Sequence, residues 1–209
     1  MGRAVICISR ETGAGGAEVG RLVADRLGFL YDDEEIVARA AEQADVDPAT
    51  IAGEERRRTL AHRVIELIVA GGVELPALAG AAPPFVPSQP AGDEIRAFIR
   101  EAIEQTAARG DVVIVAHAAS FALEPSTRNL RVLVVGGPEA RARRLGEREG
   151  LDTAEAERSV REGDAGRRDY LKRFYGVDRE LPSHYDLVVN TDLLGVDQAA
   201  GVISHAAGL

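Results

Sequence analysis

The feature that most constrains the fold of this chain is a glycine-rich turn between a hydrophobic strand and a helix near its start. Residues 4–9 (AVICIS) form a continuous apolar, β-branched run, the pattern of a strand buried on both faces of a sheet. The glycine-rich segment 12–16 follows, and apolar residues then recur at helical spacing up to Leu27, where Gly28 ends the helix. Such a turn directs backbone N–H groups and the positive end of the helix dipole at one point. The sequence therefore predicts an anion site, for which phosphate is the usual occupant.

Strands and helices alternate along the rest of the chain. Short apolar runs predict further strands at 29–32, 111–116, 130–135 and 187–189. Helical periodicity predicts helices at 34–44, 54–70, 93–109, 138–148, 153–174 (interrupted near Gly163 and Gly166) and 196–207. Residues 71–92 are rich in proline, glycine and alanine, which predicts a mobile loop inside the domain. This order predicts an α/β fold with a mainly parallel sheet, covered by helices on both faces, in one domain over 1–209.

Charge and cysteine content restrict the partners and the compartment. The net charge is −9 and the pI is about 5.0, so the surface repels nucleic acids and anionic membranes, and neither is an expected partner. No apolar run approaches the roughly 18 residues that a membrane-spanning helix needs. Cys7 is the one cysteine, which excludes an internal disulfide and predicts a small buried core residue. We expect a cytoplasmic protein; the sequence does not indicate its oligomeric state.

Two phosphate-binding motifs compete for the glycine loop, and each matches in part. The dinucleotide pattern G-x-G-x-x-G fits Gly13 and Gly15, but its third glycine falls at Glu18, where close packing of helix on strand requires glycine. Asp32 lies about 20 residues further on, where that motif has an acid for the ribose.

The P-loop pattern G-x-x-x-x-G-K-[ST] matches the same loop at its last glycine, Gly15. Arg10 stands at the first glycine of the pattern. Gly16 replaces the lysine, and Ala17 replaces the serine or threonine. As bare patterns, both motifs are therefore broken.

Several longer segments resemble the cytidylate kinase-like family. The opening ISRETGAGG, followed by a helix and LGFLYDDEEI, is similar to that family's start, in which an ISRE-x-G-[SA]-G-G loop replaces the ordinary P-loop. Three later segments also resemble the family in the right order: VLVVGGPEARARRLGEREGLDTAEAE, REGDAGRRDYLKRFYGVD and HYDLVVNTDLLGVDQAAGVI. The resemblance implies a P-loop nucleoside-monophosphate-kinase fold with five parallel strands and a lid at about 150–178. It also implies transfer of the γ-phosphoryl group of ATP, with Mg²⁺, to an acceptor such as CMP or dCMP.

Phosphoryl transfer depends on positioning and on neutralising charge, so the candidate residues are mainly glycines and arginines. We expect the loop to hold the phosphates of ATP, through Thr12, Gly13, Ala14, Gly15, Gly16 and Ala17. Since the loop has no lysine, Arg10 is the first candidate for the missing positive charge, although it could also be a surface arginine paired with Glu11. Thr12 is a candidate Mg²⁺ ligand, because Ala17 has no hydroxyl.

A second group of basic residues lies in the expected lid. Arg161, Arg167 and Arg168 fall near helical spacing with Asp164, and we place them on one face, with the arginines contacting phosphate and Asp164 on the acceptor side. Gly163 and Gly166 would let the lid bend. The alternative is a solvated charged helix.

The acceptor site is predicted from the end of the second strand and from the segment after the third. In the family, an acid at the end of the second strand contacts the acceptor, which indicates Asp32 and its neighbour Asp33; a helix N-cap is an equal alternative. His117 stands where the family tends to have an arginine, and its charge near neutral pH is conditional. The four histidines show no metal-ligand spacing.

Three functions follow, in order of support. The first is an ATP-dependent kinase of the cytidylate kinase-like group. The second is a catalytically silent nucleotide-binding protein, which Gly16, Ala17 and His117 favour. The third, a dinucleotide-dependent oxidoreductase, conflicts with Glu18 and with the arginine-rich lid.

Overall fold

The computed structural model describes residues 4–33, 92–115 and 119–208. The strands are β1 Val5–Arg10, β2 Leu30–Asp32, β3 Val112–Val115, β4 Asn129–Val135 and β5 Leu187–Asn190. The helices are α1 Gly16–Leu27, α4 Gly92–Arg109, α5 Ala119–Ala122, α6 Pro138–Glu149, α7 Thr153–Tyr175 and α8 Thr191–Ala206, with a short 3-10 helix, η1, at Pro182–His184. The predicted helices at 34–44 and 54–70, and the predicted loop at 71–92 apart from Gly92, lie outside the described residues.

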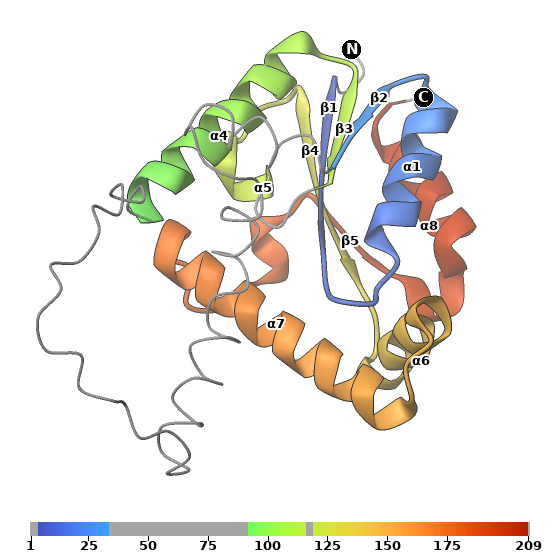
Figure 1. Ribbon diagram of the computed structural model, residues 1–209. Coiled ribbons are helices and arrows are strands. Elements are labelled where there is room, and N and C mark those ends of the chain that lie inside the picture. The colour runs from blue at the N-terminus through green and yellow to red at the C-terminus, as the bar shows by residue number, and fades with distance from the viewer. Residues whose placement is uncertain (1–3, 34–91, 116–118, 209) are drawn as a thin grey trace, which may run out of the picture.

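The five strands form one parallel sheet in the order β2-β3-β1-β4-β5, which confirms the predicted α/β class. Helices α1 and α8 cover one face of the sheet, and α4 and α5 lie on the other (Figure 1). β1 is the central strand, so its carboxyl end opens at the middle of one sheet edge. In open parallel sheets, ligands bind outside the carboxyl ends of the strands.

The core explains why β1 reads as an unbroken apolar run. Ile6 and Ile8 pack in one cluster with Val19 of α1 and Ile203 of α8, and all four side chains have no exposed surface. Cys7, between the two isoleucines, is likewise fully buried, and burial raises the pKa of its thiol to about 12. The predicted role of Cys7 as a small core residue is therefore confirmed.

Two helices differ from the sequence prediction. α7 is one unbroken helix from Thr153 to Tyr175, so the predicted interruption near Gly163 and Gly166 is wrong. A capping box at Asp152 starts this helix; α6 packs against its first part, and Phe121 of α5 packs against its last part. Tertiary contact thus overrides the low helix propensity of glycine.

The last helix begins earlier than its periodicity indicates. Asn190 caps α8 by accepting a hydrogen bond from the Asp192 N–H, so the first helical residue is Thr191. Gly195 has non-helical backbone angles (φ 68°) and separates this first turn from the helix predicted from Val196 onward.

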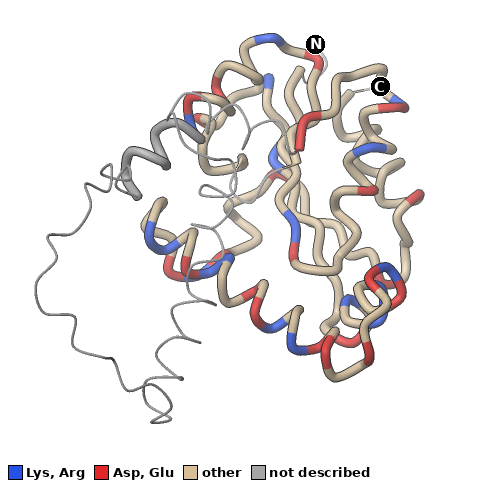
Figure 2. The backbone as a smooth tube through the Cα atoms, viewed as in Figure 1, with Lys and Arg blue, Asp and Glu red and all other residues tan. Residues whose placement is uncertain are grey.

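Charged residues gather along α6 and α7, beside the carboxyl end of β1 (Figure 2). Both signs of charge are present there, although the whole chain is acidic. Among the described helices, none is long and apolar enough to cross a membrane.

Candidate phosphate-binding site

The loop between β1 and α1 has the conformation that its glycines permit. Gly13 and Gly15 both have φ 79°, a left-handed conformation that side chains other than glycine rarely adopt. Gly15 is the residue directly before α1, and its carbonyl accepts the bond from the Val19 N–H that begins the helix. The N–H groups of the first helical turn have no partner within the helix and remain available to a ligand.

Side chains from α6 and α8 bind the carbonyl groups of this loop. Arg141 donates to the Thr12 carbonyl at 2.9 Å, and Arg144 donates to the Gly13 carbonyl at 3.1 Å. The Thr191 hydroxyl donates to the Ala14 carbonyl at 2.9 Å. Because three consecutive carbonyls are bound in this way, the peptide groups are fixed with their oxygens toward α6 and α8. This fixed orientation is what a pre-formed anion site requires.

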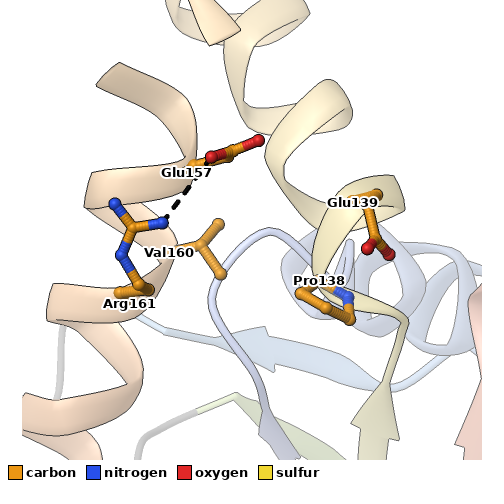
Figure 3. Close-up of a pocket in the computed structure, with 5 residues that line it drawn as sticks. All are labelled: Pro138, Glu139, Glu157, Val160 and Arg161. Atoms are coloured by element: carbon orange, nitrogen blue, oxygen red, sulfur yellow. Dashed lines mark ion pairs between the residues drawn. The ribbon is translucent and has the colours of Figure 1, made fainter. Parts of the chain in front are cut away.

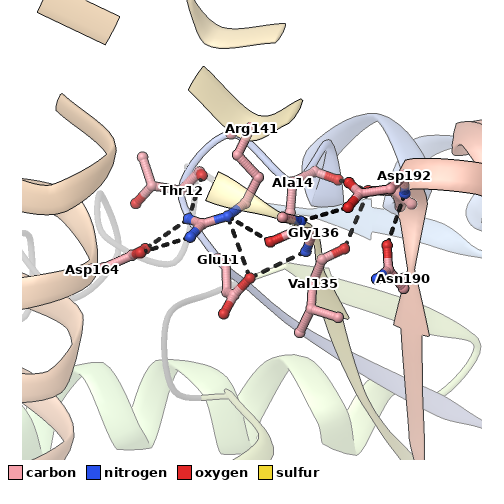
Figure 4. A network of polar contacts seen from close by, with 12 residues as sticks. Glu11, Thr12, Ala14, Val135, Gly136, Arg141, Asp164, Asn190 and Asp192 are labelled. Atoms are coloured by element: carbon pink, nitrogen blue, oxygen red, sulfur yellow. Dashed lines mark hydrogen bonds and ion pairs between the residues drawn. The ribbon is translucent and has the colours of Figure 1, made fainter. Parts of the chain in front are cut away.

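Arg141 is the centre of a larger network behind the loop (Figure 4). Its guanidinium is almost buried and binds both carboxylate oxygens of Asp164 on α7, at 2.9 and 3.0 Å. It also donates to the Gly136 carbonyl at 2.9 Å and lies 3.4 Å from the Glu11 carboxylate. One residue of α6 therefore joins the glycine loop, the end of β4 and helix α7.

A cavity of about 380 Å³ opens at the loop. Its lining residues are Arg10, Glu11, Thr12, Gly13, Gly15, Gly16, Ala17, Glu18, Arg21 and Arg148. Three arginines thus line it against two glutamates, so its side chains carry a net positive charge in an acidic protein. This balance suits a polyanion.

Arg10 lies where the sequence analysis expects it, at the start of the loop. Its side chain runs past Gly16, and its Nη1 is 3.9 Å from the Asp33 carboxylate. The alternative interpretation, a surface Arg10 paired with Glu11, does not match the structure, because Glu11 lies beside Arg141 and Arg10 lies beside Asp33.

The predicted acids of the second strand separate into two roles. Asp32 is buried and accepts a hydrogen bond from Thr106 of α4 at 3.2 Å. Asp33 lies beside Arg10 and accepts a 2.8 Å hydrogen bond from the Tyr31 hydroxyl. Burial, followed by this bond, raises the pKa of Tyr31 above its usual value. Asp33, and not Asp32, is therefore the acid next to the loop; His117 lies outside the described residues.

The three predicted lid arginines do not share one face, which corrects the sequence prediction. Arg161 is exposed and pairs with Glu157, and both line a second pocket of about 240 Å³ between α6 and α7 (Figure 3). Arg168 is also exposed, whereas Arg167 is buried. The cause is helical geometry, since residues six apart lie well over a quarter turn from each other. None of the three lines the cavity at the loop.

Arg167 has a partner that the sequence analysis did not foresee. Its guanidinium donates two hydrogen bonds to Glu180, at 2.6 and 3.0 Å, and the Tyr185 hydroxyl donates to the same carboxylate. The Tyr185 ring also packs edge-on against Phe121 of α5. The arrangement fixes the segment after α7 against α5.

Sequence reasoning missed two groups of arginines, for different reasons. Arg21 lies four residues after Ala17, on the same side of α1, so helical spacing alone could have indicated it. Arg148 and Arg141 come from α6, more than 120 residues from the loop, and no local pattern indicates their position.

Comparisons with known proteins agree with this geometry. A solved structure of an uncharacterized protein from Eubacterium ventriosum is similar with a TM-score of 0.68 and 17% identity, over 98% of each chain. Shikimate kinase from Bacteroides thetaiotaomicron is similar with a TM-score of 0.51 and 14% identity, over 99% of each chain. These likenesses and the loop after the central strand define a P-loop kinase-type fold.

The sequence comparisons identify the family within that class. The model of the Cytidylate kinase-like family matches residues 5–193, and the chain therefore belongs to this family. A cytidylate kinase from Methanopyrus kandleri is 31% identical over 115 residues, which are 51% of this chain. The matched region spans 58% of the length of that relative.

Proposed function

We propose that this protein transfers the γ-phosphoryl group of ATP to a nucleoside monophosphate, with CMP or dCMP as the favoured acceptor. The observation that carries the proposal is the glycine loop, whose carbonyls are held by Arg141, Arg144 and Thr191 beside a cavity lined by arginines. Family membership supports a phosphotransferase, and the name of the Methanopyrus relative supports cytidine nucleotides.

The residues at the loop suit the charge of a triphosphate. The first-turn N–H groups of α1 would bind phosphate oxygens, as helix N-termini do. Arg10, Arg21 and Arg148 would balance the negative charge, since all three line the cavity. A fixed set of donors needs little reorganisation when charge shifts during transfer, and this lowers the barrier.

The same cavity fits Mg²⁺ bound together with a nucleotide. Mg²⁺ keeps several waters and usually binds one or two carboxylates plus phosphate oxygens. Glu11 and Glu18 are the carboxylates that line the cavity, and Thr12 adds a hydroxyl. The ion would neutralise charge on the transferred group.

We assign the acceptor side to the end of β2, where Asp33 lies beside Arg10. Asp33, Asp32, His117 and Asp164 remain the candidate acceptor residues, with Asp33 in the most direct position. Among the α7 arginines, Arg161 and Arg168 are exposed, and Arg161 would have to leave Glu157 to approach a bound nucleotide. A phosphate contact by Arg167 would require it to leave Glu180.

A silent nucleotide-binding protein is the second candidate. Two observations favour it: position 17 has no hydroxyl, and none of the three α7 arginines lines the cavity. Such a protein would bind ATP without forming a product.

One panel separates the two functions. Purified protein is incubated with ATP and Mg²⁺ plus each of CMP, dCMP, UMP, AMP and GMP, and nucleoside diphosphates are resolved by chromatography. Calorimetry with ATP, CMP and NAD runs in parallel. A diphosphate product from CMP or dCMP supports the kinase. ATP binding without any product supports the silent binder, and absence of ATP binding contradicts both.

A further inference from the structure

Two positions of the glycine loop have exchanged residue types relative to the ordinary P-loop pattern. In G-x-x-x-x-G-K-[ST], glycine comes first and lysine follows the last glycine. Aligned on Gly15, this chain has Arg10 in place of the first glycine and Gly16 in place of the lysine. The cationic residue and the glycine have therefore changed places.

The structure gives a steric reason why the two changes occur together. Arg10 is the last residue of β1 and Gly16 is the first residue of α1. A Cβ atom on Gly16 would lie 2.5 Å from the Arg10 Cβ and 2.9 Å from its Cδ. Both distances are below the 3.0 Å that Cβ atoms in proteins keep. Because the sheet and the helix fix both backbones, only one of these positions has room for a side chain.

The Arg10 head group has unused capacity at the cavity. Its Nη1 is buried but has no hydrogen-bond partner among the described residues, and its carboxylate neighbour, Asp33, is 3.9 Å away. A buried donor without an acceptor is unfavourable. The Arg10 side chain is 29% exposed and lines the cavity, so a phosphate oxygen there can reach its guanidinium, which binds such charged acceptors strongly.

We propose that Arg10 and Gly16 are a reciprocal replacement of the P-loop glycine and lysine. Arg10 reaches the nucleotide phosphates from the end of β1, through the space that a lysine at position 16 would fill from α1. The inference rests on the proposed function only in taking a nucleoside triphosphate as the ligand of the loop. It does not depend on whether the phosphoryl group is transferred.

The charge part of the proposal is tested by returning the loop to the ordinary pattern. Arg10→Gly should weaken ATP binding about 10- to 100-fold, as expected for a lost charged hydrogen bond. Gly16→Lys alone should also weaken binding, because its side chain meets Arg10. The double variant Arg10→Gly/Gly16→Lys should bind ATP within about 3-fold of wild type by calorimetry, a strong non-additivity. Exposed Arg109, changed to alanine, is the control for overall charge.

The steric part is tested with alanine, which adds a Cβ but no charge. Gly16→Ala should lower the melting temperature of the wild-type protein. In the Arg10→Gly background, the same change should lower the melting temperature much less, because the Arg10 side chain is gone. The same double variant should still bind ATP as weakly as Arg10→Gly. Stability and affinity therefore respond to different halves of the exchange, which a merely structural role for Arg10 would not produce.

Three results would overturn the replacement. The first is wild-type ATP affinity in folded Arg10→Gly. The second is a Gly16→Ala variant with unchanged melting temperature and affinity. The third is a folded Arg10→Gly/Gly16→Lys that binds ATP no better than Arg10→Gly. All readouts are binding and melting, so a protein that binds ATP but forms no product would refute the kinase and leave this inference standing.

Discussion

Gly15 shows how a single backbone conformation places the site. Its φ of 79° turns the chain from β1 into α1, and its position before the helix places the first-turn N–H groups at the cavity. The sequence alone indicated this glycine, because a glycine run after a buried strand has few other uses. It did not indicate that Gly16 is required by contact with Arg10, since that contact joins two elements.

Gly15→Ala should abolish ATP binding at moderate cost in stability. A left-handed residue other than glycine costs roughly 1–2 kcal/mol, and the new methyl group would meet Val196 Cγ2 at 3.3 Å. Gly28→Ala is the matched control, because Gly28 ends the same helix with φ 67° and has no atom near its Cβ position. In urea, Gly28→Ala should show the cost of the left-handed conformation alone and Gly15→Ala a somewhat larger loss, and only Gly15→Ala should lose ATP binding by calorimetry. Equal ATP affinity in the Gly15→Ala and Gly28→Ala variants would show that the loop does not bind ATP.

At the scale of elements, α6 supports the loop through side chains that no local pattern reveals. The sequence predicted helix α6 nearly to its ends, and also the strand before it. It could not predict that Arg141 crosses to the Thr12 carbonyl, because periodicity locates a buried face and not its distant partner. The prediction for Arg167 was wrong for a related reason. A basic residue in a charged helix is expected to be exposed, and the sequence does not show that Glu180 lies beside it in the fold.

Arg141→Ala should be far more costly than the loss of an ordinary ion pair. It leaves Asp164 and Glu11 without their guanidinium and the Thr12 carbonyl without its donor, and breaking a buried pair costs about 3–5 kcal/mol. Arg131→Ala is the control, since it also removes a two-bond pair, with Asp186, but at a more exposed position, where roughly 1 kcal/mol is expected.

Urea unfolding measures both losses, and ATP titration of the folded fraction measures the effect on the loop. Only Arg141→Ala should weaken ATP binding. A loss of stability without any change in ATP affinity would show that the loop keeps its geometry without Arg141.

Gly163 is a point of close approach between α7 and the loop. A Cβ there would lie 3.0 Å from the Cβ and the Cγ2 of Thr12. Gly163→Ala should therefore destabilise the protein, because crowding of about 1–3 kcal/mol exceeds the about 0.5–1 kcal/mol that alanine gains in a helix. Thr12→Ala should recover part of the loss in the double variant, as measured by thermal melting. A more stable Gly163→Ala would mean that α7 does not rest on the loop.

At the scale of the whole molecule, the described elements divide into a sheet with its covering helices and an α6–α7 pair beside the loop (Figure 1). The sheet and its class follow from the alternation of apolar runs with helical periods, because strands that are buried on both faces have continuous apolar sequences. The contact of α7 with the loop does not follow from the sequence pattern. It depends on Gly163 and on the Arg141–Asp164 pair, whose positions are set by packing.

This arrangement predicts how α7 responds to ligand. Because the helix is continuous from Thr153 to Tyr175, it should move as one body, so hydrogen exchange along its whole length should slow together when ATP and CMP are both bound. ATP alone should slow exchange mainly in the loop and the first turn of α1. Mass spectrometry of peptides covering 153–162 and 167–175 distinguishes this from bending at Gly163 and Gly166, which would protect the second peptide without the first. If neither peptide changes with any nucleotide, α7 is a fixed support of the loop, and closure by the α7 arginines is excluded.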